Sequence, residues 1–339
     1  MCTSPPPVSL PDKLRFLSEP ATYPERPPTV ELRETHLSYV FLTPTEVYKM
    51  KKPVANGYVD LHTLAAREAN CRAEVQLNRR LAPHVYLGII ALMQRDDGAL
   101  ALGGAGSVVE WLVQMRRLPA AAMMDDMIRR GMLTPADVAT LAQRLADFFA
   151  MQGKVDISVA EHTAQLRHEI EVSMQVLLDP RFALPAATLA TVQGVLARYL
   201  DHGTDLAARV DAGRIIEGHG DLRPEHVCLS VPPVVIDCLE FNRALRRLDP
   251  FDEVAFLALE CARLGAPWVG PRLRQDIATR LQDDPPLRLS AFYTALRGCI
   301  RARLVAAHLL ESVPRTPEKW LPLARDYLAR AEQACAQLD

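Results

Sequence analysis

The sequence predicts an α+β fold in two lobes: a small antiparallel β-rich lobe with one helix, followed by a larger, mainly helical lobe. Up to about residue 116, short runs rich in β-branched and aromatic residues alternate with turn signals. After Pro119, apolar residues recur at helical spacing, interrupted at 215–242 by short strand-like runs. The expected boundaries are a proline-rich arm at 1–28, which we expect to be an extended strap or poorly ordered, the β-rich lobe at 29–116 and the helical lobe at 117–339.

Residues 35–115 are expected to contain strand, strand, helix, strand and strand. The runs THLSYVFL and VYKMKKPV are typical of two strands, and Pro44 between them fits position i+1 of a turn. Apolar residues at helical spacing among charged ones predict an amphipathic helix over 63–81. Further strands are expected at 84–93 and 106–115, on either side of the turn signal RDDG. The run GGAGS lacks the GK[ST] ending of a P-loop, so a turn is expected there.

The helical lobe is expected to begin its first long helix at Thr134. Thr134, Pro135 and Asp137 suit the N-cap, N1 and N3 positions, and apolar residues then recur on one face. Further helices are expected at 157–178, 186–211, 250–265, 270–282, 286–312 and 317–337, the last two as an antiparallel pair.

The composition is that of an ordinary globular protein, with 49% hydrophobic and 24% charged residues among 339. A formal net charge of −2 gives no electrostatic sign of a nucleic-acid or membrane partner. The seven cysteines form no CxxC pair, so neither a disulfide framework nor a zinc site is expected. No apolar run approaches the roughly 18 residues of a membrane span. We therefore expect a reduced, cytoplasmic protein, and its oligomeric state stays open.

The interruption at 215–242 places many polar residues between apolar runs. Its polar members are His219, Asp221, Arg223, His226, Asp237 and Glu240. Carboxylates buried beside strands are costly unless they are hydrogen-bonded or bind a cation. Metal-assisted phosphoryl transfer requires one carboxylate that orients a hydroxyl and takes its proton, and another that holds Mg²⁺. This stretch is therefore the candidate for chemistry.

Two motifs in this stretch resemble a known family. HGDLRPEHVCL followed by VVIDCLEF is similar to the catalytic loop and metal-binding segment of the aminoglycoside phosphotransferase family, within the protein kinase-like superfamily. VYKMKKPV, EVQLNRRLAPHVYLG and LDPFDEVAFLALECARLG resemble an uncharacterised bacterial subgroup of that family. The resemblance covers about 35–265. It implies a protein kinase-like two-lobed fold, ATP and Mg²⁺ as cofactors, and a small-molecule hydroxyl as phosphate acceptor.

The resemblance also implies roles for individual residues. Asp221 matches the catalytic aspartate, His219 the histidine that supports its loop, and Asp237 the aspartate that binds metal. Lys49 matches the lysine that contacts the α- and β-phosphates, and Glu74 matches its ion-pair partner.

Several of these assignments have rivals. Lys51 shares the strand face of Lys49, because side chains alternate with period two, and Glu68 lies on the same helix as Glu74. We favour Lys49 and Glu74. Arg223 meets either a phosphate or a nearby carboxylate. Asp249 and Asp252 either cap the next helix or support the catalytic loop.

The sequence departs from the superfamily at two places. His226 stands where most members have asparagine, and imidazole is a poor ligand for Mg²⁺. The second metal position is therefore open, with Glu225, Glu240 and Asn242 as alternative oxygen donors. No glycine-rich phosphate loop joins the first two strands, so phosphate cover is expected from Thr35, His36 and Ser38. The stretch WLVQMRRLP resembles the hinge that binds adenine, with Gln114, Met115 and Arg116 as its candidate residues.

Three functions follow as hypotheses. The first is an ATP-dependent phosphotransferase that moves the γ-phosphate to a hydroxyl of an unidentified small molecule. The second is a non-catalytic nucleotide-binding regulator, suggested by His226 and the missing glycine loop. The third is a protein kinase, which the absence of a recognisable activation segment after Asp237 disfavours. Acidic residues near the site suit a cationic acceptor, although helix surfaces commonly carry such charges; they are Glu240, Asp252, Glu253 and Glu260.

Overall fold

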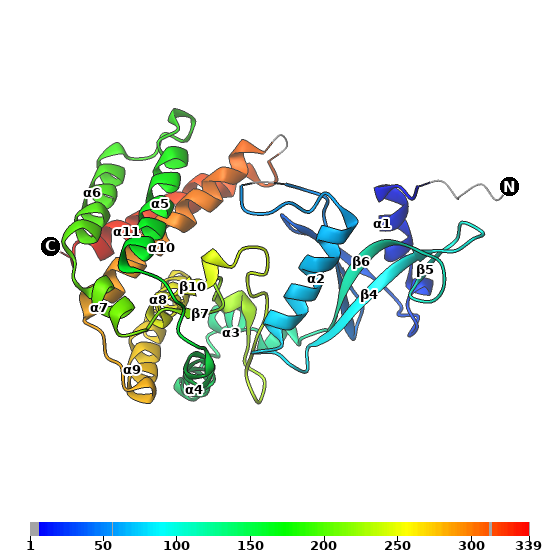
Figure 1. Ribbon diagram of the computed structural model, residues 1–339, viewed down its shortest axis with the longest axis horizontal. Coiled ribbons are helices and arrows are strands. Elements are labelled where there is room, and N and C mark those ends of the chain that lie inside the picture. The colour runs from blue at the N-terminus through cyan, green and yellow to red at the C-terminus, as the bar shows by residue number, and fades with distance from the viewer. Residues whose placement is uncertain (1–6, 56, 312–313, 339) are drawn as a thin grey trace. The chain divides into compact units, whose positions relative to one another are not determined.

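The computed structural model describes residues 7–55, 57–311 and 314–338 (Figure 1). It divides into two compact units. The first unit comprises Met1–Met123 together with Val234–Leu245, and the second comprises Met124–Pro233 together with Arg246–Asp339. The segment that carries Asp237 and Glu240 thus belongs to the first unit, whereas the HGD motif belongs to the second.

The first unit is built on a six-stranded antiparallel sheet in the order β1-β2-β3-β6-β4-β5. The strands are β1 (Glu31–Glu34), β2 (Ser38–Leu42), β3 (Glu46–Lys51), β4 (Tyr86–Gln94), β5 (Leu100–Leu102) and β6 (Ser107–Arg116). The four expected strands are present. The two that were not expected give little signal, because β1 is wholly exposed and shows no apolar alternation, and β5 has three residues.

Helix α2 (Leu64–Asn78) packs against β4 and β6 and follows its N-cap Thr63, whose hydroxyl accepts the N–H of Ala66 at 3.1 Å. Most of its buried residues are polar or charged, which is unusual for a helix that covers a sheet. Arg67, for example, donates two hydrogen bonds to Glu110 of β6, at 2.7 and 2.9 Å. This helix therefore brings charged groups to one face of the sheet.

The proline-rich start differs from the expected strap. Residues Leu10–Ser18 form helix α1, which Ser9 caps by accepting the N–H of Asp12 at 3.3 Å, and proline stands in its first turn. Leu17 is fully buried, in an apolar cluster with side chains of β2, β3, β4 and β6. The β-rich lobe therefore carries two helices, α1 and α2, where one was expected. Residues 1–6 of the predicted arm lie outside the described residues.

The second unit is mainly helical. Its helices are α3 (Met124–Arg129), α4 (Pro135–Met151), α5 (Val159–Leu177), α6 (Ala186–His202), α7 (Asp205–Asp211), α8 (Pro250–Arg263), α9 (Val269–Leu281), α10 (Leu287–Ala307) and α11 (Trp320–Cys335). Helix α4 begins as predicted, with a capping box in which Thr134 and Asp137 bond each other's backbone. The single helix expected at 186–211 is two helices, which part at Gly203. The short α3 was not expected, because six residues are too few to show a helical repeat of apolar residues.

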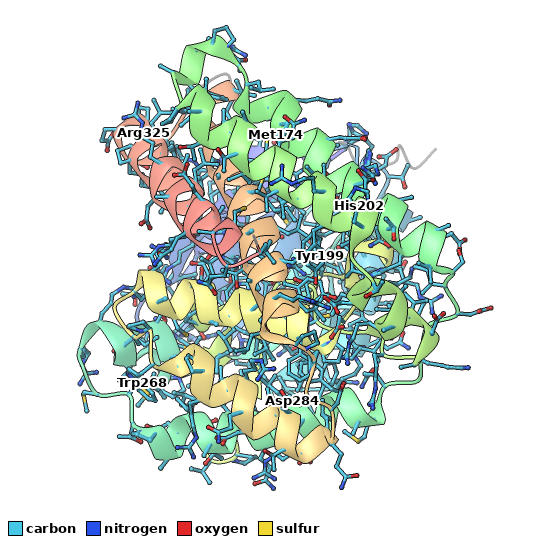
Figure 2. The ribbon with its side chains drawn as sticks, turned by 90° about the vertical axis from the view of Figure 1, so that its left-hand side faces the viewer. Met174, Tyr199, His202, Trp268, Asp284 and Arg325 are labelled. Carbon is cyan, nitrogen blue, oxygen red and sulfur yellow. The ribbon has the colours of Figure 1, made fainter. Side chains whose placement is uncertain are left out.

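Helix α10 lies at the centre of this unit and packs against α5, α6, α8 and α11. Figure 2 shows the second unit from the side on which α9 crosses below α8, with Trp268 and Asp284 near its two ends. Two short strands, β7 (Ile216–Glu217) and β10 (Arg247–Leu248), pair antiparallel and hold the two ends of the polar stretch together. Strand β8 (Val227–Cys228) follows the HGD motif, and β9 (Val234–Val235) opens the segment that returns to the first unit.

None of the helices in the described part of the chain combines the length and apolar character that a bilayer span requires. The six described cysteines are buried thiols.

Candidate active site

The two lysines of β3 lie on the face of the sheet that α2 covers. Strand residues alternate between faces, so Tyr48 and Met50 point into the apolar core and Lys49 and Lys51 point the other way. Lys49 Nζ donates to Glu74 Oε1 at 2.9 Å, and Lys51 Nζ forms an ion pair with Glu74 Oε2. Burial alone would raise the pKa of Glu74, but the two lysines hold it below its usual value.

The partner of Lys49 is therefore Glu74, the residue favoured on sequence. Its rival Glu68 forms an i,i+4 pair with Arg72 at 2.7 Å on the exposed side of α2. The difference follows from helix geometry, because residues 68 and 74 are six apart and project in different directions.

The returning segment adds two carboxylates to this face. Lys49 Nζ donates to Asp237 Oδ1 at 2.7 Å, and Lys51 Nζ donates to Glu240 Oε1 at 2.6 Å. The two pairs differ in exposure: the side chains of Lys49 and Asp237 are 13% and 41% exposed, whereas that of Lys51 is 1% exposed. Within this unit, Lys49 and Asp237 are therefore the pair that a ligand can reach, and Lys51 is a buried counter-ion. Sequence periodicity alone could not separate the two lysines.

Asp237 is held in an unusual backbone conformation. Its φ is +63°, in the left-handed region that non-glycine residues seldom adopt, although aspartate and asparagine tolerate it best. Its N–H donates to Tyr86 Oη at 3.1 Å, and the next N–H, of Cys238, donates to Asn78 Oδ1 at 2.9 Å. Asn78 also donates to the carbonyl oxygen of Glu74 at 2.9 Å. The strain is thus maintained by contacts with α2 and β4 and marks a constrained position.

Tyr86 and Asn78 are site residues that the sequence analysis missed. Both lie in EVQLNRRLAPHVY, the motif that resembled the family, and Asn78 comes one helical turn after Glu74. A buried asparagine on the same helix face as a buried glutamate is a signal that points to a second contact, but it does not identify the partner 160 residues away.

A separate candidate cluster is the HGD loop, in the second unit. Glu253 Oε1, in the first turn of α8, accepts the N–H groups of His219 at 2.8 Å and of Gly220 at 2.5 Å. Glu253 is buried, and this burial raises its pKa to about 7. The loop is therefore tied to α8 through its backbone.

Glu253, rather than its two acidic neighbours, supports the loop. Asp249 caps α8 by accepting the N–H of Phe251 at 2.8 Å, and it also accepts hydrogen bonds from Arg209 at 2.5 and 3.0 Å. Asp252 accepts two hydrogen bonds from Arg297, at 2.7 and 2.6 Å. The capping interpretation is thus confirmed for Asp249, and Asp252 is an ion-pair partner of α10.

Asp221 keeps an ionised carboxylate. Burial acts to raise its pKa, but nearby positive charge, first that of Arg223 and also that of Arg301, outweighs burial and lowers it. Arg223 Nη2 donates to Asp221 Oδ2 at 2.9 Å, and the Asp221 N–H donates to His219 Nδ1 at 3.3 Å. Arg223 therefore contacts a carboxylate in this structure, which was one of the two alternatives for it.

His226 braces the loop with both ring nitrogens. Its Nδ1 lies 2.9 Å from the carbonyl oxygen of Asp221, and its Nε2 lies 3.1 Å from Arg223 Nη2. Because a guanidinium can only donate, Nε2 must accept and Nδ1–H must donate. In this arrangement no lone pair of His226 is left for a metal ion. The metal-ligand role considered for this residue is therefore not what the geometry favours.

The alternative oxygen donors are also engaged. Glu240 accepts from Lys51 at 2.6 Å, Glu225 pairs with Arg223, and Asn242 Oδ1 accepts the N–H of Ala244 at 2.9 Å. Across the described residues, no group of three or more His, Cys, Asp and Glu side chains is arranged around a point that could hold a metal ion. Mg²⁺ commonly takes only one or two carboxylates and fills its remaining positions with phosphate and water oxygens. The half-exposed carboxylate of Asp237 fits that requirement.

The predicted hinge and phosphate cover are both engaged within the sheet. Gln114, Met115 and Arg116 lie on β6, which pairs with β3 on one side and β4 on the other, and the Arg116 N–H donates to the Val85 carbonyl oxygen at 2.8 Å. Between β1 and β2, Thr35 closes a tight turn: its N–H donates to the Ser38 carbonyl oxygen at 2.8 Å. Roles for these residues in nucleotide binding stay predictions.

Together, the antiparallel sheet with its lysine and helix glutamate, and the helical unit with its HGD loop, define a protein kinase-like fold. Solved structures of small-molecule kinases share it. A choline kinase from Cryptosporidium parvum matches with a TM-score of 0.53 at 10% identity, over 96% of each chain. A choline/ethanolamine kinase family protein from Mesorhizobium loti matches with a TM-score of 0.51 at 13% identity, over 96% of this chain and 99% of the other. The predicted fold class is thus confirmed.

Two other proteins also align with the chain. An aminoglycoside phosphotransferase from Streptomyces rimosus aligns over 79% of this chain and 90% of its own, at 18% identity and a TM-score of 0.44. An uncharacterised protein of Mycobacterium tuberculosis is 30% identical over 309 residues, which are 85% of this chain and 57% of that protein. The chain thus spans little more than half the length of the curated relatives it matches. No protein-family model matches the chain.

Proposed function

We propose that this chain is an ATP-dependent phosphotransferase that moves the γ-phosphate to a hydroxyl group of a small molecule. The observation that carries the proposal is the position of Lys49 between Glu74 and Asp237. An ammonium group has three donors, and these carboxylates accept from two of them, which leaves the third for a phosphate oxygen. Ion pairing with both carboxylates keeps the lysine charged, because their attraction outweighs burial and raises its pKa.

The nucleotide half of the reaction is assigned to the first unit. Lys49 would bind phosphate oxygens, and the exposed carboxylate of Asp237 would hold Mg²⁺. When bound there, the metal ion would offset the negative charge of the phosphate groups. Glu74 and Asn78 fix the lysine and the Asp237 segment before any ligand arrives, so no rearrangement of these side chains is required.

The acceptor half is assigned to the second unit. Asp221 would orient the acceptor hydroxyl and take its proton, since its carboxylate is ionised and hydrogen-bonded to only one guanidinium nitrogen, that of Arg223. His219, His226 and Glu253 hold the loop that carries it. Phosphoryl transfer leaves little covalent work for the protein, so alignment and charge would supply most of the rate enhancement.

The acidic residues that suggested a cationic acceptor are already paired. Asp252 is bound by Arg297, and Glu260 Oε1 accepts hydrogen bonds from Arg301 at 2.9 Å and Tyr327 at 2.6 Å. Glu240 binds Lys51, and Glu253 holds the loop backbone. These four residues therefore give no support to a cationic acceptor, and the acceptor class stays open.

The test is phosphate transfer from labelled ATP to a panel of hydroxyl-bearing metabolites, combined with separate measurement of nucleotide binding. D221N is expected to abolish transfer with little change in ATP affinity, whereas K49M is expected to weaken ATP binding. D201N is the matched control, because Asp201 is an exposed aspartate that pairs only with Arg167 on the surface. Equal transfer by D221N and the unsubstituted chain would contradict the assignment of Asp221.

One observation favours a second function, a nucleotide-binding regulator without transferase activity. Both ring nitrogens of His226 are engaged by the loop, so it supplies no second metal ligand. This alternative predicts saturable ATP binding that depends on Lys49, with neither transfer nor phosphate release above the D221N background. The same pair of assays therefore separates the two functions.

A further inference from the structure

A cavity of about 420 Å³ opens between α8, α9, α10 and α11 in the second unit. Its lining includes neither a residue of the HGD loop nor Glu253, which supports that loop. Its walls are mainly small apolar side chains, among them Ala255, Ala258, Ala262, Ala291 and Ala334. Leu287, which also lines it, is 71% exposed. The cavity therefore presents apolar surface to solvent and shares no lining residue with the HGD loop.

The sequence builds this cavity by using opposite faces of α8. Glu253 and Glu260 point to the loop and to α10, while Ala255, Ala258 and Ala262 line the cavity. Helices α8 and α9 approach closely at its floor, because a Cβ atom added to Gly270 would lie 2.8 Å from the Cβ of Ala258. Small residues on both helices thus bring the backbones together and leave an open space beyond them.

Among the described residues that line the cavity, two are charged, and both are arginines. Arg274 Nη2 donates to Asp284 Oδ1 at 2.7 Å and to the Pro285 carbonyl oxygen, while its Nε is buried and has no hydrogen-bond partner within the described part of the chain. Arg330 donates to Asp326 through Nε, at 3.2 Å to each oxygen. Both guanidinium groups thus keep N–H donors for a further acceptor.

We propose that this cavity binds a single-chain amphipathic carboxylate, with its hydrocarbon chain against the alanine-lined walls and its carboxylate at Arg274 and Arg330. Burial of the hydrocarbon chain supplies the apolar part of the affinity, and the guanidinium N–H donors that are not bonded within the chain bind the carboxylate. A carboxylate matches two planar guanidinium groups that each keep N–H donors beyond those given to Asp284 or Asp326. The proposal is independent of phosphate transfer, because it concerns binding alone.

The test is titration of the full chain with decanoate, laurate and myristate, below their micelle concentrations, by calorimetry and tryptophan fluorescence. Trp268 precedes α9 next to the lining residue Pro267 and is a local reporter, and W268F identifies its share of the signal. We expect saturable binding with one site. Affinity should rise by up to roughly fourfold for each added methylene group that is buried.

Variants distinguish the contribution of the ligand's carboxylate to binding from that of its hydrocarbon chain. R274Q and R330Q are each expected to weaken laurate binding about tenfold and to leave dodecanol binding unchanged, since the alcohol lacks the charge. A262L narrows the cavity and should weaken both ligands. R325Q is the matched control: Arg325, labelled in Figure 2, lies on the same helix as Arg330 but does not line the cavity, so the variant removes the same charge elsewhere. Thermal unfolding of each variant confirms that it folds.

Three results would overturn the proposal. The first is no saturable binding of any of the three acids to the unsubstituted chain. The second is equal binding of acid and alcohol, or binding that R274Q, R330Q and A262L leave unchanged in folded protein. The third is concentration-dependent dimerisation that A262L abolishes and laurate does not, which would assign this face to a second copy of the chain.

Discussion

Glu253 provides the sharpest test of how the HGD loop is held. It is buried, and it accepts two backbone hydrogen bonds from His219 and Gly220. Replacement by alanine leaves both N–H groups without that acceptor, and each buried unsatisfied donor costs about 1–3 kcal/mol. E253A should therefore lower the free energy of unfolding of the helical unit by roughly 2–6 kcal/mol. E253Q keeps a carbonyl oxygen in place and should cost much less.

The same residue predicts a pH dependence. Burial raises the pKa of Glu253 from 4.5 to about 7, so between these values the folded chain retains a proton that the unfolded chain has lost. The stability that this group contributes is fully present below pH 4.5 and is lost as the pH rises through about 7. The change amounts to about 3 kcal/mol. E253Q cannot titrate and should lack this fall.

Urea unfolding at pH 4.5, 6 and 8, followed by circular dichroism, measures both effects. E171Q is the matched control, because Glu171 is an exposed carboxylate on α5. The difference in unfolding free energy between the unsubstituted chain and E253Q should change with pH, and the difference for E171Q should stay flat. A flat difference for E253Q would refute the claim that this carboxylate is protonated in the folded protein near neutral pH.

Three further predictions concern other buried groups. K51M should destabilise the β-rich unit by about 3–5 kcal/mol, because it leaves the buried Glu74 short of a counter-ion, whereas K49M should mainly weaken nucleotide binding. Urea unfolding measures the first effect and ATP titration the second. Equal effects of the two variants in both assays would contradict these separate roles of Lys51 and Lys49. D237A should be less stable than D237G by about 1–2 kcal/mol, because only glycine adopts φ near +63° without cost; thermal unfolding that ranks them the other way would refute the strain. H162L should be no less stable than the unsubstituted chain above pH 6.5 and more stable below it, because burial lowers the pKa of His162 to about 4 and neither ring nitrogen has a hydrogen-bond partner among the described residues. The stability that the neutral histidine contributes is lost as the pH falls from 6.5 toward 4. A larger loss of unfolding free energy at acid pH in H162L than in the unsubstituted chain would contradict this.

The sequence predicted the local features of the site better than its long-range contacts. Period-two alternation placed Lys49 and Lys51 on one face of β3, and the structure bears this out. Which of them a ligand reaches depends on the segment that covers them, nearly 190 residues later in the chain. No local pattern contains that information, because it is a property of tertiary packing.

Two features were not predicted from the sequence, helix α1 and the contact of Glu253 with the HGD loop. Prolines in the first 28 residues suggested a strap, yet Leu10, Leu14 and Leu17 lie at helical spacing and Pro11 is tolerated in a first turn. Composition was given more weight than period, and α1 was missed. The Glu253 contact was missed for another reason: Asp249, Asp252 and Glu253 all lie in one helix start, and only the fold decides which of them turns toward the loop.

The charges on α8 and α10 show why an acidic stretch in a sequence does not by itself identify a cation site. Asp252, Phe256 and Glu260 recur every fourth residue and so share a face of α8, and Arg297 and Arg301 are likewise four apart on α10. The two faces meet: Arg297 binds Asp252, Arg301 binds Glu260, and the Arg297 guanidinium lies 5.0 Å from the centre of the Phe256 ring.

Buried ion pairs of this kind add little net stability, because desolvation offsets their attraction. Their effect here is on position and charge. They set the register of α10 against the helix that holds the HGD loop, and Arg301 helps to lower the pKa of Asp221. On the proposed function, the acidic face of α8 thus holds Arg301 in place through Glu260, and it is Arg301 that helps to keep the catalytic carboxylate ionised.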